Sequence, residues 1–191
     1  MRVISGKAKG RRLKRVPGDT TRPIMDRVKE SLFNILGPAE VAGARWLDLF
    51  AGTGQVGIEA LSRGSREVVF VDMARAAIKT IFQNLKMTGL ADQAVVVSSD
   101  AFAYLDRAEH GRFDLIYVAP PQYKGIWIEV MRVLDKRPLT WLEAHGLVVV
   151  QIDPKEYAPL QLQNLRLLDE RTYGNTLLCF YEVAIPADHK L

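Results

Sequence analysis

The sequence predicts an α/β fold in which a mostly parallel sheet carries helices on both faces, and three observations support this. Residues 45–57, RWLDLFAGTGQVG, are typical of a buried strand, a tight glycine turn and the start of a helix. Strand-like apolar runs then alternate with helical patterns, as in parallel sheets joined by helices. Acids close the first two strands, at Asp48 and Asp72, where open sheets bind ligands.

Length and composition fit one main domain with a small appendage. The chain has 191 residues, and we expect a basic arm over residues 1–24 and the α/β domain over residues 25–191. The single cysteine, Cys179, excludes a disulfide framework, and three scattered histidines lack metal-ligand spacing. No apolar stretch has the length of a membrane span or follows the basic start as a signal sequence would. We therefore expect a cytoplasmic monomer with no metal and no membrane partner.

The glycine corner predicts a cofactor site. Gly52, Gly54 and Gly57 satisfy the G-x-G-x-x-G spacing of dinucleotide-binding loops. Asp48 lies four residues earlier in an otherwise apolar strand. Because a buried carboxylate is costly without a partner, it favours a cofactor with an ammonium or amino group. The alternative is that Asp48 only caps the amides of its own loop.

Two further acids stand where later strands end. Asp72 closes the predicted strand 68–71, and its carboxylate suits two ribose hydroxyls of either kind of cofactor. A helix is predicted over 74–87, and a strand over 94–97. Asp100 follows this strand; it either accepts from an exocyclic amine such as that of adenine or caps a helix over 101–109.

A proline motif ends the fourth predicted strand, 113–118. Pro120 and Pro121 predict a rigid turn that leaves carbonyl oxygens free. Fixed acceptors beside a methyl donor are what amine methylation requires, because they align the nitrogen and need little acid–base chemistry. Tyr123 offers a ring for stacking on a base. The alternative is an ordinary loop between a strand and a helix.

The N-terminal segment carries the excess positive charge. Residues 1–27 have a balance of +7 within a chain of +4, which leaves −3 for the remainder. A basic arm on a slightly acidic body is typical of phosphate-backbone binding. Apolar residues on both sides of a glycine-containing turn predict a small two-stranded ribbon leaning on the domain, rather than the alternative of a disordered tail. A helix should follow from Asp26, its N-cap, with Val28, Leu32, Ile35 and Leu36 as the apolar stripe, to Gly37–Pro38.

These segments together resemble the bacterial small-subunit ribosomal RNA guanine-N2 methyltransferases of the RsmD type. The resemblance covers nearly the whole chain, through RVISGKAKGRRL, TRPIMDRVKESLFNIL, LDLFAGTGQVGIEALSRG, VFVD and the proline motif. It implies the Rossmann-like class I S-adenosylmethionine-dependent methyltransferase fold, with seven strands and one antiparallel strand near the edge. A fifth strand over 146–152 and a closing hairpin of 165–172 and 176–183 about Gly174–Asn175 fit that fold.

The resemblance also implies a function. The expected reaction is methylation of the exocyclic N2 amine of one guanine, with ribosomal RNA, the small subunit or its assembly intermediate as partner and S-adenosylmethionine as cofactor. The expected cofactor-binding residues are Asp48, Phe50, Ala51, Gly52, Gly54, Asp72, Met73, Asp100, Ala101 and Phe102. The expected catalytic residues are Pro120, Pro121, Gln122 and Tyr123. We expect RNA phosphates at Lys7, Lys9, Arg11, Arg12, Lys14, Arg15 and Arg22.

The chain departs from this family at the proline motif. The family has an acid or amide, then Pro-Pro, then Phe or Tyr, whereas here Ala119 precedes the prolines and Gln122 follows them. Loss of one oriented hydrogen bond to a transition state costs about 3–4 kcal/mol. The Pro120 carbonyl and the Gln122 amide oxygen are possible substitutes. Three functions therefore stay open: a methyltransferase with altered catalytic detail or target, a binding protein of the same fold without catalysis, and a nicotinamide-dependent oxidoreductase.

Overall fold

The computed structural model describes residues 1–18, 24–107 and 111–184 of the chain. Two units make up the chain, Met1–Asp106 and Arg107–Leu191. The elements of the first unit are α1 (Asp26–Val41), β1 (Arg45–Asp48), α2 (Gln55–Ser62), β2 (Glu67–Asp72), α3 (Arg75–Thr88), η1 (Ala91–Gln93), β3 (Ala94–Ser98) and α4 (Ala101–Leu105). Those of the second unit are β4 (Phe113–Val118), α5 (Ile126–Lys136), α6 (Pro138–Trp141), β5 (Leu142–Ile152), η2 (Pro154–Glu156), β6 (Leu165–Tyr173) and β7 (Thr176–Val183).

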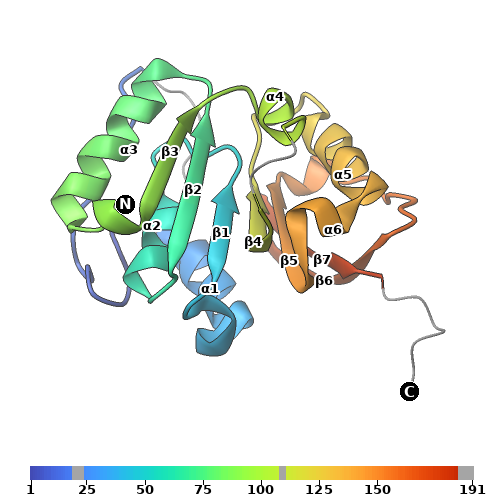
Figure 1. Ribbon diagram of the computed structural model, residues 1–191, viewed down its shortest axis with the longest axis horizontal. Coiled ribbons are helices and arrows are strands. Elements are labelled where there is room, and N and C mark those ends of the chain that lie inside the picture. Colours follow the sequence, from blue (N-terminus) through green and yellow to red (C-terminus); the bar gives the residue numbers. More distant parts are fainter. Residues whose placement is uncertain (19–23, 108–110, 185–191) are drawn as a thin grey trace. The chain divides into compact units, whose positions relative to one another are not determined.

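Three parallel strands in the order β3-β2-β1 form the sheet of the first unit (Figure 1). Asp48 of β1 pairs with Phe70, and Asp72 of β2 pairs with Ser98, so the carboxyl ends of all three strands meet at one edge. The strands β1 and β2 are apolar and buried because α2 and α3 pack on them. The acids at their ends are therefore positioned by a rigid core.

Close packing of α2 on β2 requires a glycine at position 57. A Cβ atom there would lie 2.3 Å from Cε1 of Phe70 and 2.8 Å from Cγ1 of Val68. The third glycine of the G-x-G-x-x-G spacing therefore lets the helix approach the strand, as the spacing predicts. Gly54 has a φ of 75° at the N-cap of α2, a conformation that glycine adopts without strain.

The helix α1 differs from its prediction at both ends and along its stripe. Met25 is the N-cap and Asp26 is already helical, so the prediction of Asp26 as the N-cap was wrong. Gly37 has a φ of 77°, which interrupts the helix, but Pro38 begins a further turn that runs to Val41 because proline suits the first turn of a helix. Ile35 is 40% exposed, whereas Lys29 and Phe33 are buried on the core face.

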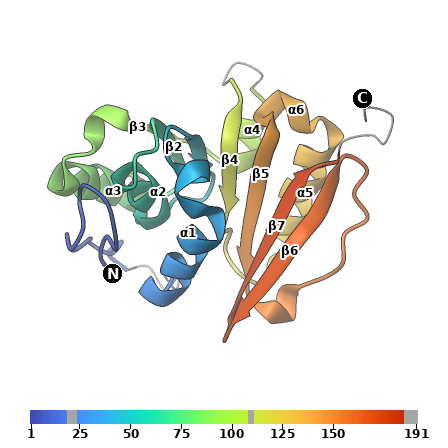
Figure 2. The ribbon, with the colours of Figure 1, turned by 90° about the horizontal axis from the view of Figure 1, so that it is seen from below.

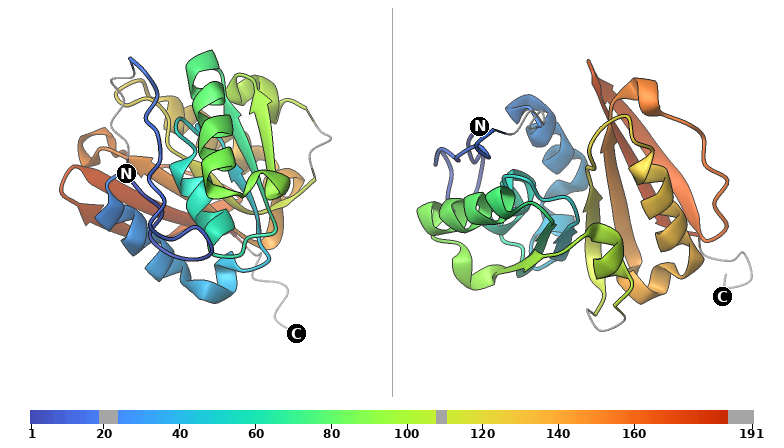
Figure 3. Two further views of the ribbon diagram at one scale, coloured as in Figure 1. Left: turned by 90° about the vertical axis from the view of Figure 1, so that its left-hand side faces the viewer. Right: turned by 90° about the horizontal axis from the view of Figure 1, so that it is seen from above.

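The strand order in the second unit is β4-β5-β7-β6 (Figure 2). β4 and β5 are parallel, and β7 is antiparallel to both β5 and β6, as predicted for one strand near the edge. The β6–β7 hairpin turns at Gly174–Asn175 as predicted. β5 begins at Leu142, earlier than predicted, and its register on β4 shifts between Phe113 and Leu115. The helix α5 lies along the strands of this unit in Figure 3.

Candidate functional site

The glycine loop after β1 is tied to the neighbouring strand β2. The Gly52 N–H donates to Oδ2 of Asp72 at 2.8 Å, and the Ala51 N–H donates to the Val71 carbonyl at 2.9 Å. A Cβ atom at Gly52 would meet nothing within 4 Å. The loop backbone therefore faces open space beside a carboxylate, which is room for a ligand to approach the main chain.

Asp48 is the most strongly perturbed acid of this corner. It is 2% exposed, and its Oδ2 accepts a 3.3 Å hydrogen bond from the Gly57 N–H in the first turn of α2. Burial raises the pKa of Asp48 to about 7, against the hydrogen bond from Gly57, which lowers it. Dinucleotide phosphates bind at this end of such a helix, so a carboxylate there opposes phosphate and favours a cationic ligand.

The other two strand-end acids differ in their roles. Oδ1 of Asp72 accepts from the Ala74 N–H at 2.9 Å, and its Oδ2 accepts from Gly52 of the glycine loop. This half-buried carboxylate therefore borders the glycine loop. Oδ1 of Asp100 accepts from the N–H groups of Phe102 and Ala103 at 2.9 and 3.1 Å, so of the two predicted roles the structure shows the helix cap. The helix α4 ends at Leu105, short of its predicted end, and residues 108–110 lie outside the described part.

The remaining predicted cofactor residues lie around these acids with different exposure. Phe50 is half-buried and Ala51 is buried at the end of β1, while Met73 after β2 is 72% exposed. Ala101 is buried and Phe102 is half-buried in the first turn of α4. The structure therefore brings the predicted cofactor set to the carboxyl ends of β1, β2 and β3.

The N-terminal arm is anchored along the first unit. Arg2 and Arg12 form an isolated antiparallel bridge, which is a shorter ribbon than predicted. Inward-facing Val3, Ala8 and Leu13 are buried. The six predicted RNA-contact residues within the described part of the arm all have exposed side chains: Lys7, Lys9, Arg11, Arg12, Lys14 and Arg15. Arg22 lies outside the described residues.

Glu59 of α2 holds the arm, a role that the sequence analysis missed. Its two carboxylate oxygens accept the N–H groups of Ile4 and Ser5 at 2.8 and 2.9 Å. The same oxygens pair with Nζ of Lys29 at 3.1 Å and Nε of Arg63 at 2.8 Å, and the Lys29 and Glu59 side chains are fully buried. Burial lowers the pKa of Lys29, although Glu59 opposes that shift. A signal existed, since Glu59 is the only charged residue in the apolar segment 55–62.

Asn84 of α3 joins the arm to the glycine loop. It is fully buried, and its side chain accepts from the Lys14 N–H at 2.7 Å and donates to the Lys14 carbonyl at 3.1 Å. Its amide also donates to the Thr53 carbonyl at 2.9 Å. One buried side chain therefore fixes both the predicted RNA-binding arm and the predicted cofactor loop.

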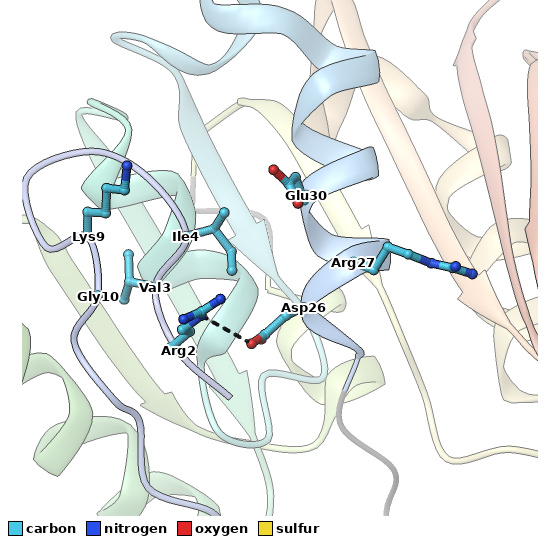
Figure 4. Close-up of a pocket in the computed structure, with 8 residues that line it drawn as sticks. All are labelled: Arg2, Val3, Ile4, Lys9, Gly10, Asp26, Arg27 and Glu30. Atoms are coloured by element: carbon cyan, nitrogen blue, oxygen red, sulfur yellow. Dashed lines mark ion pairs between the residues drawn. The ribbon is translucent and has the colours of Figure 1, made fainter.

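A pocket of about 440 Å³ lies where the arm faces the start of α1 (Figure 4). Nε of Arg2 lies 3.8 Å from Oδ2 of Asp26, and Arg27 points away from the arm. Lys9 is the only predicted RNA-contact residue among the described residues that line it. The cations Arg2, Lys9 and Arg27 line the pocket together with the acids Asp26 and Glu30, so its net charge is only slightly positive and gives no strong preference for an anion.

The proline motif follows β4 in the second unit. Pro120 is buried, whereas Pro121, Gln122 and Tyr123 are exposed. The Tyr123 hydroxyl donates to Oδ2 of Asp153 at 2.7 Å, and the Tyr123 N–H donates to Oε1 of Glu156. These two acids, after the end of β5, were not predicted, because nothing in the local sequence links them to a loop 30 residues away.

Over residues 1–18, 24–107 and 111–184, no three His, Cys, Asp or Glu side chains are grouped so as to hold a metal ion. Within the same ranges, every helix is too short or too polar to cross a membrane.

Comparison with known proteins gives consistent matches along the chain. A family model described as "Conserved hypothetical protein 95" matches residues 1–182. The Bacillus subtilis protein named "Putative rRNA methyltransferase YlbH" is 42% identical over 185 residues, which cover 95% of this chain and 98% of that protein. The Escherichia coli (strain K12) "Ribosomal RNA small subunit methyltransferase D" is 33% identical over 95% of this chain and 89% of its own length.

A solved structure extends the similarity to the fold. The structure titled "Putative methyltransferase yhhF from Escherichia coli" has a TM-score of 0.83 and 33% identity, and the match covers 96% of this chain and 97% of that one. The Rossmann-like methyltransferase fold predicted from the sequence is confirmed. The chain therefore belongs to the family described as "Conserved hypothetical protein 95", to which the RsmD-type and YlbH proteins belong.

Proposed function

We propose that this protein is an S-adenosylmethionine-dependent ribosomal RNA methyltransferase, and that it methylates the exocyclic N2 amine of a guanine in small-subunit RNA. The observation that carries the proposal is the set of strand-end carboxylates about the open glycine loop, with buried Asp48 against the first turn of α2. Family membership and the names of the relatives support methylation of ribosomal RNA, and the exocyclic N2 amine of guanine as its target is part of the proposal.

The residues of the first unit fit this cofactor. When bound, S-adenosylmethionine supplies an electrophilic methyl group on a sulfonium. Asp48 would pair with its ammonium group and Asp72 would accept its ribose hydroxyls, while open space above Gly52 admits the ligand to the backbone. A nicotinamide dinucleotide fits less well because Asp48 opposes a phosphate at α2.

The second unit would hold the base that receives the methyl group. The Pro120 carbonyl and the Gln122 side-chain oxygen are acceptors for an amine, so they can orient the nitrogen and build electron density on it. The exposed ring of Tyr123 can stack on the base. The exposed cations of the arm, from Lys7 to Arg15, would contact RNA phosphates without reading sequence.

Ala119 supports a second candidate function. An acid is missing from this position, and removal of one oriented acceptor lowers a rate by about a hundred- to a thousandfold. A protein that binds cofactor and RNA without transferring the methyl group would keep the loop and the arm and tolerate that loss.

Transfer of labelled methyl from S-adenosylmethionine to small ribosomal subunits lacking native methylation separates these candidates. Nucleoside analysis should find labelled N2-methylguanosine. A different labelled nucleoside would contradict the proposed target and retain the methyltransferase. If cofactor binds, no label is transferred and Ala119→Asp restores transfer, the binding protein is the correct function.

A further inference from the structure

Tyr123 has a backbone conformation that side-chain-bearing residues avoid. Its φ is 60°, and among residues 1–18, 24–107 and 111–184 it is the one non-glycine residue with a positive φ. Glycine adopts this region freely, and Gly125 in the same loop does so with a φ of 66°. The loop therefore places a tyrosine where a glycine would be less strained.

Two acids fix Tyr123 at both ends. Its side chain is 64% exposed, yet its hydroxyl donates to Oδ2 of Asp153 and its main-chain N–H donates to Glu156. Asp153 is itself 7% exposed and is held as the cap of η2, since its Oδ1 accepts the Lys155 N–H at 2.9 Å. The ring of Tyr123 is therefore exposed, whereas the carboxylate that holds its hydroxyl is buried and fixed by a second hydrogen bond.

The protonation states keep this arrangement at neutral pH. The hydrogen bond to Asp153 raises the pKa of the Tyr123 hydroxyl, so the hydroxyl remains a donor. The Lys155 N–H and then the Tyr123 hydroxyl lower the pKa of Asp153, so its carboxylate remains an acceptor.

We infer that Asp153 and Glu156 are positioning residues that hold the ring of Tyr123 as a preformed stacking surface for a nucleobase. This inference rests on the proposed function and explains the altered motif, in which the aromatic residue lies one place later than in the family. A ring that is already ordered binds a base without the entropy loss of ordering a free side chain. Backbone strain that local contacts maintain on an exposed side chain is typical of a functional site.

A double-mutant cycle tests whether Asp153 acts through the Tyr123 hydroxyl. Tyr123→Phe keeps the ring and loses the hydrogen bond from the hydroxyl to Asp153. We expect the KM for RNA to rise about 2- to 12-fold, which corresponds to the net free energy of one hydrogen bond. Asp153→Ala should have a similar effect in the native background and a clearly smaller one in the Tyr123→Phe background, where only its capping of η2 is left to lose. The KM for the cofactor should stay constant, and Asp153→Asn, which keeps one of the two acceptor oxygens, should recover part of the loss.

Additive effects of Tyr123→Phe and Asp153→Ala on the KM for RNA would overturn the inference, because Asp153 would then act independently of the ring. If the native protein transfers no methyl group, the proposed function fails, and the same cycle measured on RNA affinity decides the inference.

The ordering of the Tyr123 ring by Asp153 and Glu156 can be measured without any reaction. In protein labelled with 3-fluorotyrosine, the ¹⁹F NMR resonance absent from Tyr123→Phe belongs to Tyr123. We expect this resonance to lie away from the position of the unfolded chain and to move to it in Asp153→Ala and Glu156→Ala. A native resonance already at the unfolded position would overturn the inference.

Discussion

The glycine loop of the first unit and the proline loop of the second are held in opposite ways. The glycine loop has glycine where φ is positive, and its supports, Asp48 and Asn84, are buried. The proline loop has Tyr123 where φ is positive, and that side chain is exposed and held by Asp153 and Glu156. The comparison teaches that the glycine loop relies on the core of its unit, whereas the proline loop relies on two side chains that follow the end of β5, at the cap of η2 and within it.

The largest expected effect comes from breaking the buried support of the first unit. Glu59→Ala removes the carboxylate that pairs with the buried Lys29 and leaves the N–H groups of Ile4 and Ser5 without that acceptor. We expect the free energy of unfolding to fall by about 3–5 kcal/mol, measured by urea denaturation. The control is Glu182→Ala in the second unit, whose partner Arg166 is exposed, with an expected loss of at most about 1 kcal/mol. Equal losses would contradict the difference between the two units.

The next effect is a pH dependence that arises from Asp48 in the first unit. The pKa of Asp48 is raised to about 7, so between about pH 4 and about pH 7 the native state binds a proton that the unfolded state releases. The contribution of Asp48 to stability therefore falls as pH rises through this window and is constant above it. Binding of an ammonium group requires the ionised carboxylate, so cofactor affinity should change in the opposite direction.

We expect the affinity for S-adenosylmethionine to be about tenfold lower at pH 6 than its limit at higher pH, because about a tenth of Asp48 is then ionised. Isothermal titration calorimetry between about pH 5 and about pH 8, which reaches beyond the pKa of Asp48, measures this, and Asp48→Asn should remove the dependence. A dependence that persists in Asp48→Asn would assign it to another group. If stability and cofactor affinity changed in the same direction with pH, Asp48 would not be the residue that pairs with the cofactor's ammonium group.

Residue order along the chain was enough to predict the glycine corner. Asp48, the three glycines and the acid at Asp72 are close in sequence, and parallel strands bring their carboxyl ends together. The supports could not be predicted in this way. Glu59 stands out as the one charged residue of segment 55–62, but the residues that it binds lie 54 and 55 positions away, and the one that Asn84 binds lies 70 away, so the partners depend on tertiary contacts.

The proline loop shows the same division. The sequence indicated an aromatic residue near the proline motif, but neither its left-handed backbone nor its anchors at Asp153 and Glu156 follow from local residue types. The prediction that the helix α1 ends at Gly37–Pro38 was wrong because the local sequence allows more than one structure. Glycine followed by proline predicts the end of a helix, yet the same pair also permits a kink and a new helical turn, which here ends at the buried Val41.

The smallest expected effect tests the strain in the proline loop directly. Tyr123→Gly and Tyr123→Ala both remove the ring, so they should lose methyl transfer equally, but only glycine relieves the left-handed backbone. We therefore expect the glycine variant to be more stable than the alanine variant by about 1–2 kcal/mol in urea denaturation. At Lys124, where φ is not positive, the order should reverse, with glycine less stable than alanine by about 0.5–1 kcal/mol. If both positions favour alanine, Tyr123 is not held in the left-handed region in solution, and its exposed ring cannot be the fixed surface that distinguishes this loop from the glycine loop.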